Sequence, residues 1–201
     1  MTPAARRLGV LGGTFDPVHI GHLILAEAAR EAAALDSVLF VPTGHSWRKP
    51  ERQVTPGEQR LEMLRLAVEG NEQFAVSDIE VKRPGPSYTH VTLEGLAAEY
   101  PGTELFFILG RDALLDLPNW REPARIAELA TLLVAERAGE AAGGPEGVQV
   151  DASGARIMRV RMPLIDVSAT DIRERVGQGR PIHYLVPQAV EDYIALHHLY
   201  V

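Results

Sequence analysis

Short apolar runs alternate along the chain with longer segments in which apolar and polar residues recur at helical spacing. The runs lack the strict alternation of a half-buried strand, so each predicts a strand that is covered on both faces. We expect strands over residues 8–11, 37–41, 74–81, 104–109, 131–135 and 156–160. We expect helices over residues 23–35, 55–69, 88–99, 126–129, 168–177 and 187–197. The small-residue-rich segment 138–154 predicts a mobile surface loop.

This alternation of strands and helices is typical of an α/β protein with a parallel sheet. We therefore expect a Rossmann-like doubly wound parallel sheet of five to six strands, with helices on both faces and a C-terminal helical region. In such sheets a ligand lies beyond the carboxyl ends of the strands, where the strand order reverses. The candidate segments are therefore those that follow the strands: 12–22, 42–49, 110–112 and the surroundings of Arg137.

Length and composition narrow the class of protein. The 201 residues suit a single domain over 1–201 with a C-terminal helical portion from about residue 165, and 46% hydrophobic residues allow a real core. A net charge of −7 argues against a nucleic-acid partner, although a local pocket can still be positive. The absence of cysteine excludes disulfides, thiolate catalysis and cysteine-based zinc sites. Without a signal-type segment or a bilayer-length apolar run, we expect a cytoplasmic protein with no membrane partner.

Two segments have the residue pattern that is typical of the N-terminus of a helix. Thr55 is expected to cap a helix, with Glu58 completing a capping box. Late in the chain, Ser168 is expected to cap a helix that has Asp171 at its third position. From its residues alone, this second segment is explained about equally well by an ordinary capped helix and by a binding site.

The link between the first expected strand and the first expected helix holds the most chemistry. Gly12 and Gly13 let backbone amides approach a phosphate without a Cβ in the way, and Thr14 adds a hydroxyl. His19 and His22 are three residues apart, so at a helix start they lie on one face. Amide donors, imidazole donors and the positive end of the helix dipole would then converge, which suits charge developing on a phosphoryl group.

The same residues leave alternatives open. Gly21 between the two histidines would leave room for a ligand against the helix. A tight strand-to-helix turn with a partly buried histidine pair would need no ligand at all. A zinc site is less well supported because no third ligand stands at a telling spacing, and we expect no protein-held metal.

The segment 12–22 resembles the Gly-x-Phe-Asp-Pro-x-His-x-Gly-His signature of the nucleotidyltransferase superfamily. Class I aminoacyl-tRNA synthetases share its His-x-Gly-His, but the chain is too short for one and lacks a Lys-Met-Ser-Lys-Ser motif. Ser168, Thr170 and Arg173 match the superfamily's Ile-Ser-Ser-Thr-x-x-Arg motif, in which Ala169 replaces the second serine. The two motifs in this order are far more specific than either alone.

Further segments resemble one branch, the bacterial nicotinate-nucleotide adenylyltransferases. Phosphopantetheine adenylyltransferases usually carry threonine where His19 stands and are shorter. The similar segments are 41–44 leading to Lys49, 83–89, 109–120 and 184–187, and the resemblance spans residues 7–197. The chain departs from the branch at 46–49, where Ser-Trp-Arg-Lys replaces Pro-Pro-His-Lys, and at 138–139, where Ala-Gly replaces Pro-Gly.

The resemblance implies a role for each matched residue. The implied catalytic residues are His19, His22, Arg173 and Lys49. The implied ATP-binding residues are Gly12, Gly13, Thr14, Phe15, His22, Gly110, Asp112, Arg137, Ser168, Thr170 and Arg173. The implied residues for the second substrate are Thr14, His19, Lys49, Tyr88, Thr89 and Trp120.

Several of these roles have plain structural alternatives. Lys49 would be a mobile-loop cation for phosphate, or a solvated loop charge. Trp120 would stack on a pyridine ring, or pack at the surface, while Thr89 and nearby amides would meet a nicotinate carboxylate. Asp112 would hold the adenosine ribose together with Gly110, or cap the helix after the fourth strand.

The implied reaction transfers the AMP moiety of ATP to nicotinic acid mononucleotide and gives deamido-NAD and pyrophosphate, a step of NAD biosynthesis. We expect in-line attack that depends on positioning and charge stabilisation, with Mg²⁺ bound mainly through ATP. Nicotinamide mononucleotide or another phosphorylated acceptor is the alternative within this class. A non-catalytic nucleotide sensor is the alternative from another class, and a homo-oligomer stays open.

Overall fold

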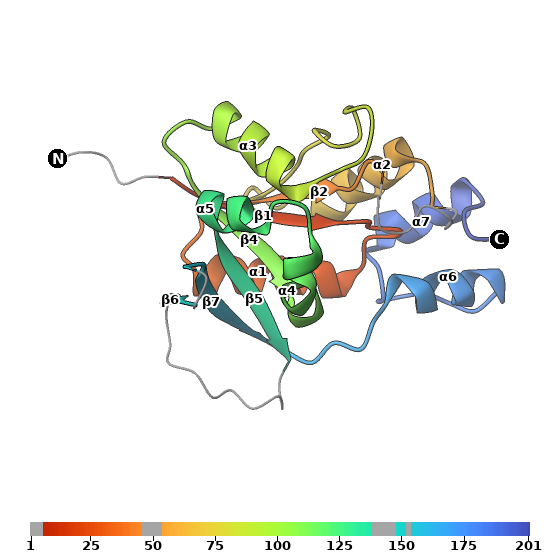
Figure 1. The fold of residues 1–201 in the computed structure, drawn as a ribbon. Coiled ribbons are helices and arrows are strands. Elements are labelled where there is room, and N and C mark those ends of the chain that lie inside the picture. Colours follow the sequence, from red (N-terminus) through yellow and green to blue (C-terminus); the bar gives the residue numbers. More distant parts are fainter. Residues whose placement is uncertain (1–5, 46–53, 138–147, 152–153) are drawn as a thin grey trace.

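The computed structural model describes residues 6–45, 54–137, 148–151 and 154–201, and its strands form one sheet between layers of helices (Figure 1). The strands are β1 (Arg7–Gly13), β2 (Ser37–Pro42), β3 (Phe74–Val76), β4 (Glu104–Gly110), β5 (Ala130–Arg137), β6 (Val148–Val150) and β7 (Arg156–Met162). The helices are α1 (Ile20–Ala32), α2 (Gly57–Val68), α3 (Thr89–Glu99), α4 (Arg111–Asp116), α5 (Pro123–Leu129), α6 (Ala169–Gly177) and α7 (Gln188–Leu196), with a 3-10 turn, η1 (Leu117–Asn119).

The sheet has the strand order β3-β2-β1-β4-β5-β7-β6. The strands β3, β2, β1, β4, β5 and β7 pair in parallel, and β6 pairs antiparallel with β7 at the edge. The order reverses at β1, where Leu11 pairs with Phe40 of β2 on one side and with Ile108 of β4 on the other. The expected doubly wound parallel sheet is confirmed, with a short antiparallel strand added at one edge.

Successive strand residues point into two separate cores, one on each face of the sheet. Val38, Phe40 and Ile108 face one core, which α1, α2, α6 and α7 complete. Leu39 and Phe107 face the other core, to which α3 and α5 contribute. Burial on both faces explains why the strands read as continuous apolar runs rather than alternating ones. The C-terminal helices share the first core with the amino-terminal strands, so the helical region expected there packs on the sheet.

Three local expectations were wrong in detail. The segment 138–154 is not all loop, because residues 148–150 form β6; residues 138–147 and 152–153 lie outside the described residues. The third strand ends at Val76 instead of residue 81, since the chain turns there and Lys82 N–H donates to the Asp78 carbonyl. Thr55 does not cap α2: the extended Pro56 is the N-cap and has no side-chain capping bond.

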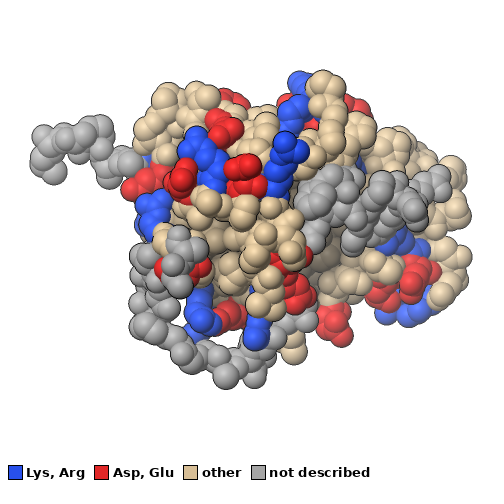
Figure 2. All heavy atoms as spheres, viewed as in Figure 1, with Lys and Arg blue, Asp and Glu red and all other residues tan. Residues whose placement is uncertain are grey.

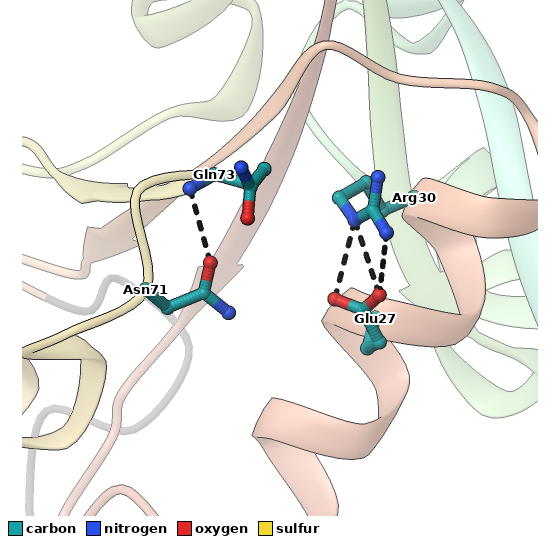
Figure 3. A network of polar contacts seen from close by, with 4 residues as sticks. All are labelled: Glu27, Arg30, Asn71 and Gln73. Carbon is teal, nitrogen blue, oxygen red and sulfur yellow. Dashed lines mark hydrogen bonds and ion pairs between the residues drawn. The ribbon is translucent and has the colours of Figure 1, made fainter.

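The described surface carries charged side chains of both signs (Figure 2). Figure 2 shows acidic and basic side chains interspersed on one face, and Glu27 and Arg30 pair within one turn of α1 (Figure 3). Near β3, the Asn71 side chain accepts from the Gln73 backbone N–H at 3.0 Å and shapes the turn that leads into the strand. No helix in the described part of the chain is long and apolar enough to cross a bilayer.

Candidate active site

A cavity of about 650 Å³ opens at the carboxyl ends of β1, β2 and β4. Its walls include Gly12 and Thr14 of the signature segment, Phe107 of β4 and Trp120 after η1. It therefore lies where the strand order reverses, the place that an open α/β sheet offers to a ligand. The strand ends supply backbone groups there, and the loops that follow supply side chains.

The two signature histidines lie against each other at the start of α1. His19 is the N-cap residue and His22 is the third helical residue. Their rings stack with centroids 3.7 Å apart, and the His19 backbone N–H donates to His22 Nδ1 at 3.2 Å. A neutral ring whose Nδ1 accepts a hydrogen bond carries its proton on Nε2, so His22 keeps one N–H donor. The expectation that the two rings share one face of a helix start is confirmed.

Burial keeps both rings uncharged. His19 is only 7% exposed, and burial lowers its pKa to about 4. Burial also lowers the pKa of His22 well below 6.5, and repulsion from a charged His19 would lower it further. The Nδ1 of His19 is buried without a hydrogen-bond partner among the residues that the structure describes. Near neutral pH the pair consists of two neutral imidazoles, which donate through N–H groups and not as cations.

Glycine has a different use here from the one the sequence suggested. A Cβ on Gly21 would lie 3.1 Å from His19 Nδ1, so the missing side chain makes room for the histidine ring instead of a ligand. A Cβ on Gly13 would lie 3.0 Å from the Phe15 ring, whereas Gly12 has ordinary space. Phe15 itself is buried in the core, and its ring packs edge-on against His22 with the ring centroids 4.9 Å apart, so it supports the histidine pair.

The start of α6 lies beside the signature segment. Ser168 caps α6 as expected, because its Oγ accepts from the Asp171 N–H at 3.1 Å. Arg173 donates from Nη2 to Thr170 Oγ1 at 3.1 Å and from Nη1 to the Asp16 carbonyl at 2.6 Å. Two motifs about 150 residues apart in sequence are thereby joined, so the capped-helix explanation and the binding explanation of this segment are compatible.

The opposite wall of the cavity is aromatic and carries a helix start. Trp120 contacts Phe107 edge-to-face at 6.1 Å, and its Nε1 donates to Asp116 at 3.1 Å. Thr89 is the first residue of α3 and lines the cavity, and the N-cap Tyr88 has the Arg121 guanidinium 4.8 Å above its ring. The first amides of a helix have no partner within it, so this wall offers donors to an anion next to an aromatic surface.

The other predicted site residues lie at or after the ends of β2, β4 and β5 in the sequence, and only some of their side chains are described. Gly110 ends β4 and is the N-cap of α4, which has no side-chain capping bond. Asp112 lies in the first turn of α4 and lines the cavity, so it does not cap that helix. Arg137 ends β5, and its side chain lies outside what the structure describes. Lys49 lies outside the described residues.

Arg60 was not expected as a site residue, and it is only 2% exposed on α2. Its guanidinium donates to the carbonyls of Thr14 and Thr43, both at 2.7 Å, and to that of Thr55 at 2.8 Å. Burial lowers the Arg60 pKa, partly offset by the nearby charge of Asp16. One side chain thus ties the ends of β1 and β2 to α2. Its spacing was the available signal, because Arg60 lies at helical spacing from Leu64 and Val68 and so falls on the buried face of α2.

A second cluster supports the α3 wall, and its members Glu80 and Thr92 were not expected from the sequence. Glu80 is buried, lines the cavity and accepts from Thr92 Oγ1 at 2.6 Å, and Arg83 donates to the same hydroxyl at 3.0 Å. Ser87 Oγ accepts from the Gly44 N–H at 3.2 Å, which joins the segment after β2 to the start of α3. Gly44 has no substitute here because a Cβ would lie 2.2 Å from the Glu80 carbonyl oxygen.

Fold and site together define a nucleotide-binding α/β protein of the doubly wound class. A family model described as cytidylyltransferase-like matches residues 10–175. A curated protein of Thermomicrobium roseum named probable nicotinate-nucleotide adenylyltransferase is 51% identical over 195 residues, which cover 96% of this chain and 91% of the relative. A protein of the same name from Roseiflexus sp. is 50% identical, with 96% and 97% covered.

A solved structure has a similar fold. It is described as Plasmodium falciparum nicotinic acid mononucleotide adenylyltransferase complexed with NaAD, and it matches with a TM-score of 0.77 over 97% of both chains. At 16% identity this likeness concerns the fold alone. On the family model and the sequence relatives, the chain belongs to the nicotinate-nucleotide adenylyltransferase family within the cytidylyltransferase-like proteins.

Proposed function

We propose that the protein transfers the AMP moiety of ATP to nicotinic acid mononucleotide and releases deamido-NAD and pyrophosphate, as its relatives' name implies. The proposal is carried by two groups of residues near the point where the strand order reverses. One group suits phosphate and the other suits a pyridine ring. The His19–His22 pair and the start of α6 form the phosphate half. The cavity between Thr89 and Trp120 forms the pyridine half.

In the phosphate half, the signature segment and α6 would hold the triphosphate. His22 Nε2–H and the His19 ring would donate to the α-phosphate oxygens as charge develops there. Ser168, Thr170 and Arg173 would meet the outer phosphates, with the Ala169 amide in place of a hydroxyl. The backbone of Gly12 to Phe15 would lie along the nucleotide, which needs no contact from the buried Phe15 ring.

In the pyridine half, Trp120 would stack on the ring, and Thr89 with the first amides of α3 would receive the carboxylate. Tyr88 precedes those amides as the N-cap. A helix start favours an anion by about 0.3–1 kcal/mol at exposed positions and by up to about 2 kcal/mol where partly buried. This electrostatic difference supports the acid over the amide mononucleotide.

The remaining roles rest on the family resemblance. Gly110 and Asp112 would hold the adenosine ribose at the end of β4. Lys49 and Arg137 would approach phosphate from their loops. Mg²⁺ would arrive with ATP as part of that substrate and neutralise triphosphate charge; in the described residues no cluster of three potential ligand side chains is present.

The chemical step needs little proton transfer. A phosphate oxygen of the mononucleotide attacks the α-phosphorus of ATP, a P–O bond forms, and the bond to the β-phosphate bridge breaks with its electron pair leaving on pyrophosphate. A phosphate monoester is already ionised near neutral pH, so no strong general base is required. The neutral histidine pair suits this step, because donors and not bases are needed.

One assay tests the proposal. The protein is incubated with ATP and Mg²⁺ and with each mononucleotide in turn, and pyrophosphate is followed. We expect rapid release with nicotinic acid mononucleotide and slower release with the amide. A preference for the amide would change the substrate but not the chemistry. No pyrophosphate with any phosphorylated acceptor would refute the enzyme and favour the nucleotide sensor.

We also propose that residues 1–201 form one nucleotidyltransferase domain. Ile172 of α6 and Val190 and Ile194 of α7 lie in the same core as β1 and β2, which supports a single cooperative unit. A cytoplasmic location, a homo-oligomer and the lack of a nucleic-acid partner stay predictions from the sequence.

A further inference from the structure

The C-terminal end of the sequence reaches back to the signature segment. The Tyr200 hydroxyl donates to Asp16 Oδ1 at 2.8 Å across a sequence separation of 184 residues. Asp16 is only 2% exposed, and it stands between Thr14, which lines the cavity, and His19, which caps α1. The contact therefore holds the middle of the link, meaning residues 14–19, and both ends of this link belong to the site.

Three side chains from distant parts of the sequence hold this link. Arg60 of α2 donates to the Thr14 carbonyl, Arg173 of α6 donates to the Asp16 carbonyl, and Tyr200 donates to the Asp16 carboxylate. The first two bind backbone oxygens, whereas Tyr200 binds the buried charge itself. A buried carboxylate needs hydrogen-bond donors, so the position of Asp16 depends on this hydroxyl.

Tyr200 is well placed to act as a fixed donor. Its ring packs against the first core, and its carbonyl would lie 3.2 Å from a Cβ built on Gly177 at the end of α6. Burial and the neighbouring Asp16 charge raise its pKa, so the hydroxyl keeps its proton throughout the physiological range. Tyr200 is thus held in place by the packing of its ring in the core and of its backbone against the end of α6.

We propose that Tyr200 is a positioning residue for nucleotidyl transfer, which acts through Asp16 to set the distance between Thr14 and the His19–His22 pair. Tyr200 does not line the cavity, and its role is to hold Asp16 and not to contact either substrate. A displaced link would leave binding energy largely intact, because Arg60 and Arg173 still hold the backbone. It would misplace donors that are needed most in the transition state, so kcat would fall more than KM rises. This inference rests on the proposed function.

The test compares two tyrosines that lose the same atom. Tyr200→Phe keeps the ring and its packing, and Tyr193→Phe is the matched control on α7, whose ring packs against the same core. We expect Tyr200→Phe to lower kcat about tenfold, the size of one lost hydrogen bond to a charged group, with KM for ATP changed less than about twofold. We expect Tyr193→Phe to keep the wild-type kcat.

A double-mutant cycle identifies the route. If Tyr200 acts through Asp16, adding Tyr200→Phe to Asp16→Ala, which removes the acceptor, should lower kcat no further than Asp16→Ala alone. Multiplying effects would overturn the coupling, and a Tyr200→Phe kcat within twofold of wild type, or equal to that of Tyr193→Phe, would overturn the role itself.

A second readout does not depend on turnover. The side-chain NMR signals of His19 and His22, recorded without substrates, should shift in Tyr200→Phe and not in Tyr193→Phe; unshifted signals would refute the positioning role. Wild-type pyrophosphate release separates the two proposals: an inactive wild type refutes the function, whereas an active wild type with unchanged variants refutes only the role of Tyr200.

Discussion

The buried histidine pair makes a prediction about stability that needs no substrate. The folded protein keeps His19 neutral down to about pH 4, whereas the reference pKa of a histidine is 6.5. Between these two pH values the unfolded chain binds a proton that the folded protein does not bind. The free energy of unfolding therefore has its full value above about pH 6.5 and falls as the pH is lowered toward 4.

The size of the effect follows from the two pKa values. A group that is protonated only in the unfolded state changes the free energy of unfolding by at most about 1.4 kcal/mol per pH unit. His19 is nearly fully buried, so solvent screening takes away little, and about 2 kcal/mol should be lost between pH 6.5 and 4.5. His22 acts in the same direction, because burial lowers its pKa as well.

Urea unfolding at a series of pH values measures this term. Carboxylates titrate in the same range, so the informative quantity is the stability difference between wild type and His19→Asn. We expect that difference to shrink by about 2 kcal/mol as the pH falls from about 7.5 to about 4.5. His198→Asn replaces an exposed histidine and is the matched control. A difference that is constant with pH, or one that His198→Asn reproduces, would show that burial of His19 does not govern the slope.

Three further changes test the site. His22→Ala should fold normally and lose roughly 10²–10³ in kcat because one donor to the developing charge is gone; an unaltered turnover number would remove the histidine from the mechanism. Trp120→Ala should raise KM for the mononucleotide more than for ATP, by about tenfold, and Trp120→Phe should recover part of this; equal effects on both substrates would place the ring elsewhere. Arg60→Met should lower the free energy of unfolding by at least about 3 kcal/mol in urea, because three partly buried carbonyls lose a donor; a loss below about 1 kcal/mol would mean that other groups replace it.

Local patterns were sufficient for much of the fold. The apolar runs at 37–41 and 104–109 became β2 and β4 within a residue or two, since buried parallel strands need apolar side chains on both faces. Ser168 was expected as a cap and is one, because a cap depends on residues three positions apart. The cap at Thr55 failed although its pattern was as good: Pro56 adopted an extended conformation, and the Thr55 carbonyl went to Arg60.

The histidine pair shows what short sequence patterns can predict and what depends on tertiary packing. That His19 and His22 share a face followed from helix geometry and their spacing alone. That both rings are neutral depends on burial under the chain that surrounds them, and spacing carries no information about burial. The use of Gly21 as space for the His19 ring was likewise visible only once the ring had a position.

The sequence by itself determined most of the strands and helices, the family and the candidate site residues, because each of these depends on short patterns in the chain. Only the tertiary structure decided what holds those residues in place. Arg60 meets Thr14 across 46 positions and Tyr200 meets Asp16 across 184. Such contacts come from the packing of whole helices on the sheet, and local propensity has no influence at that range.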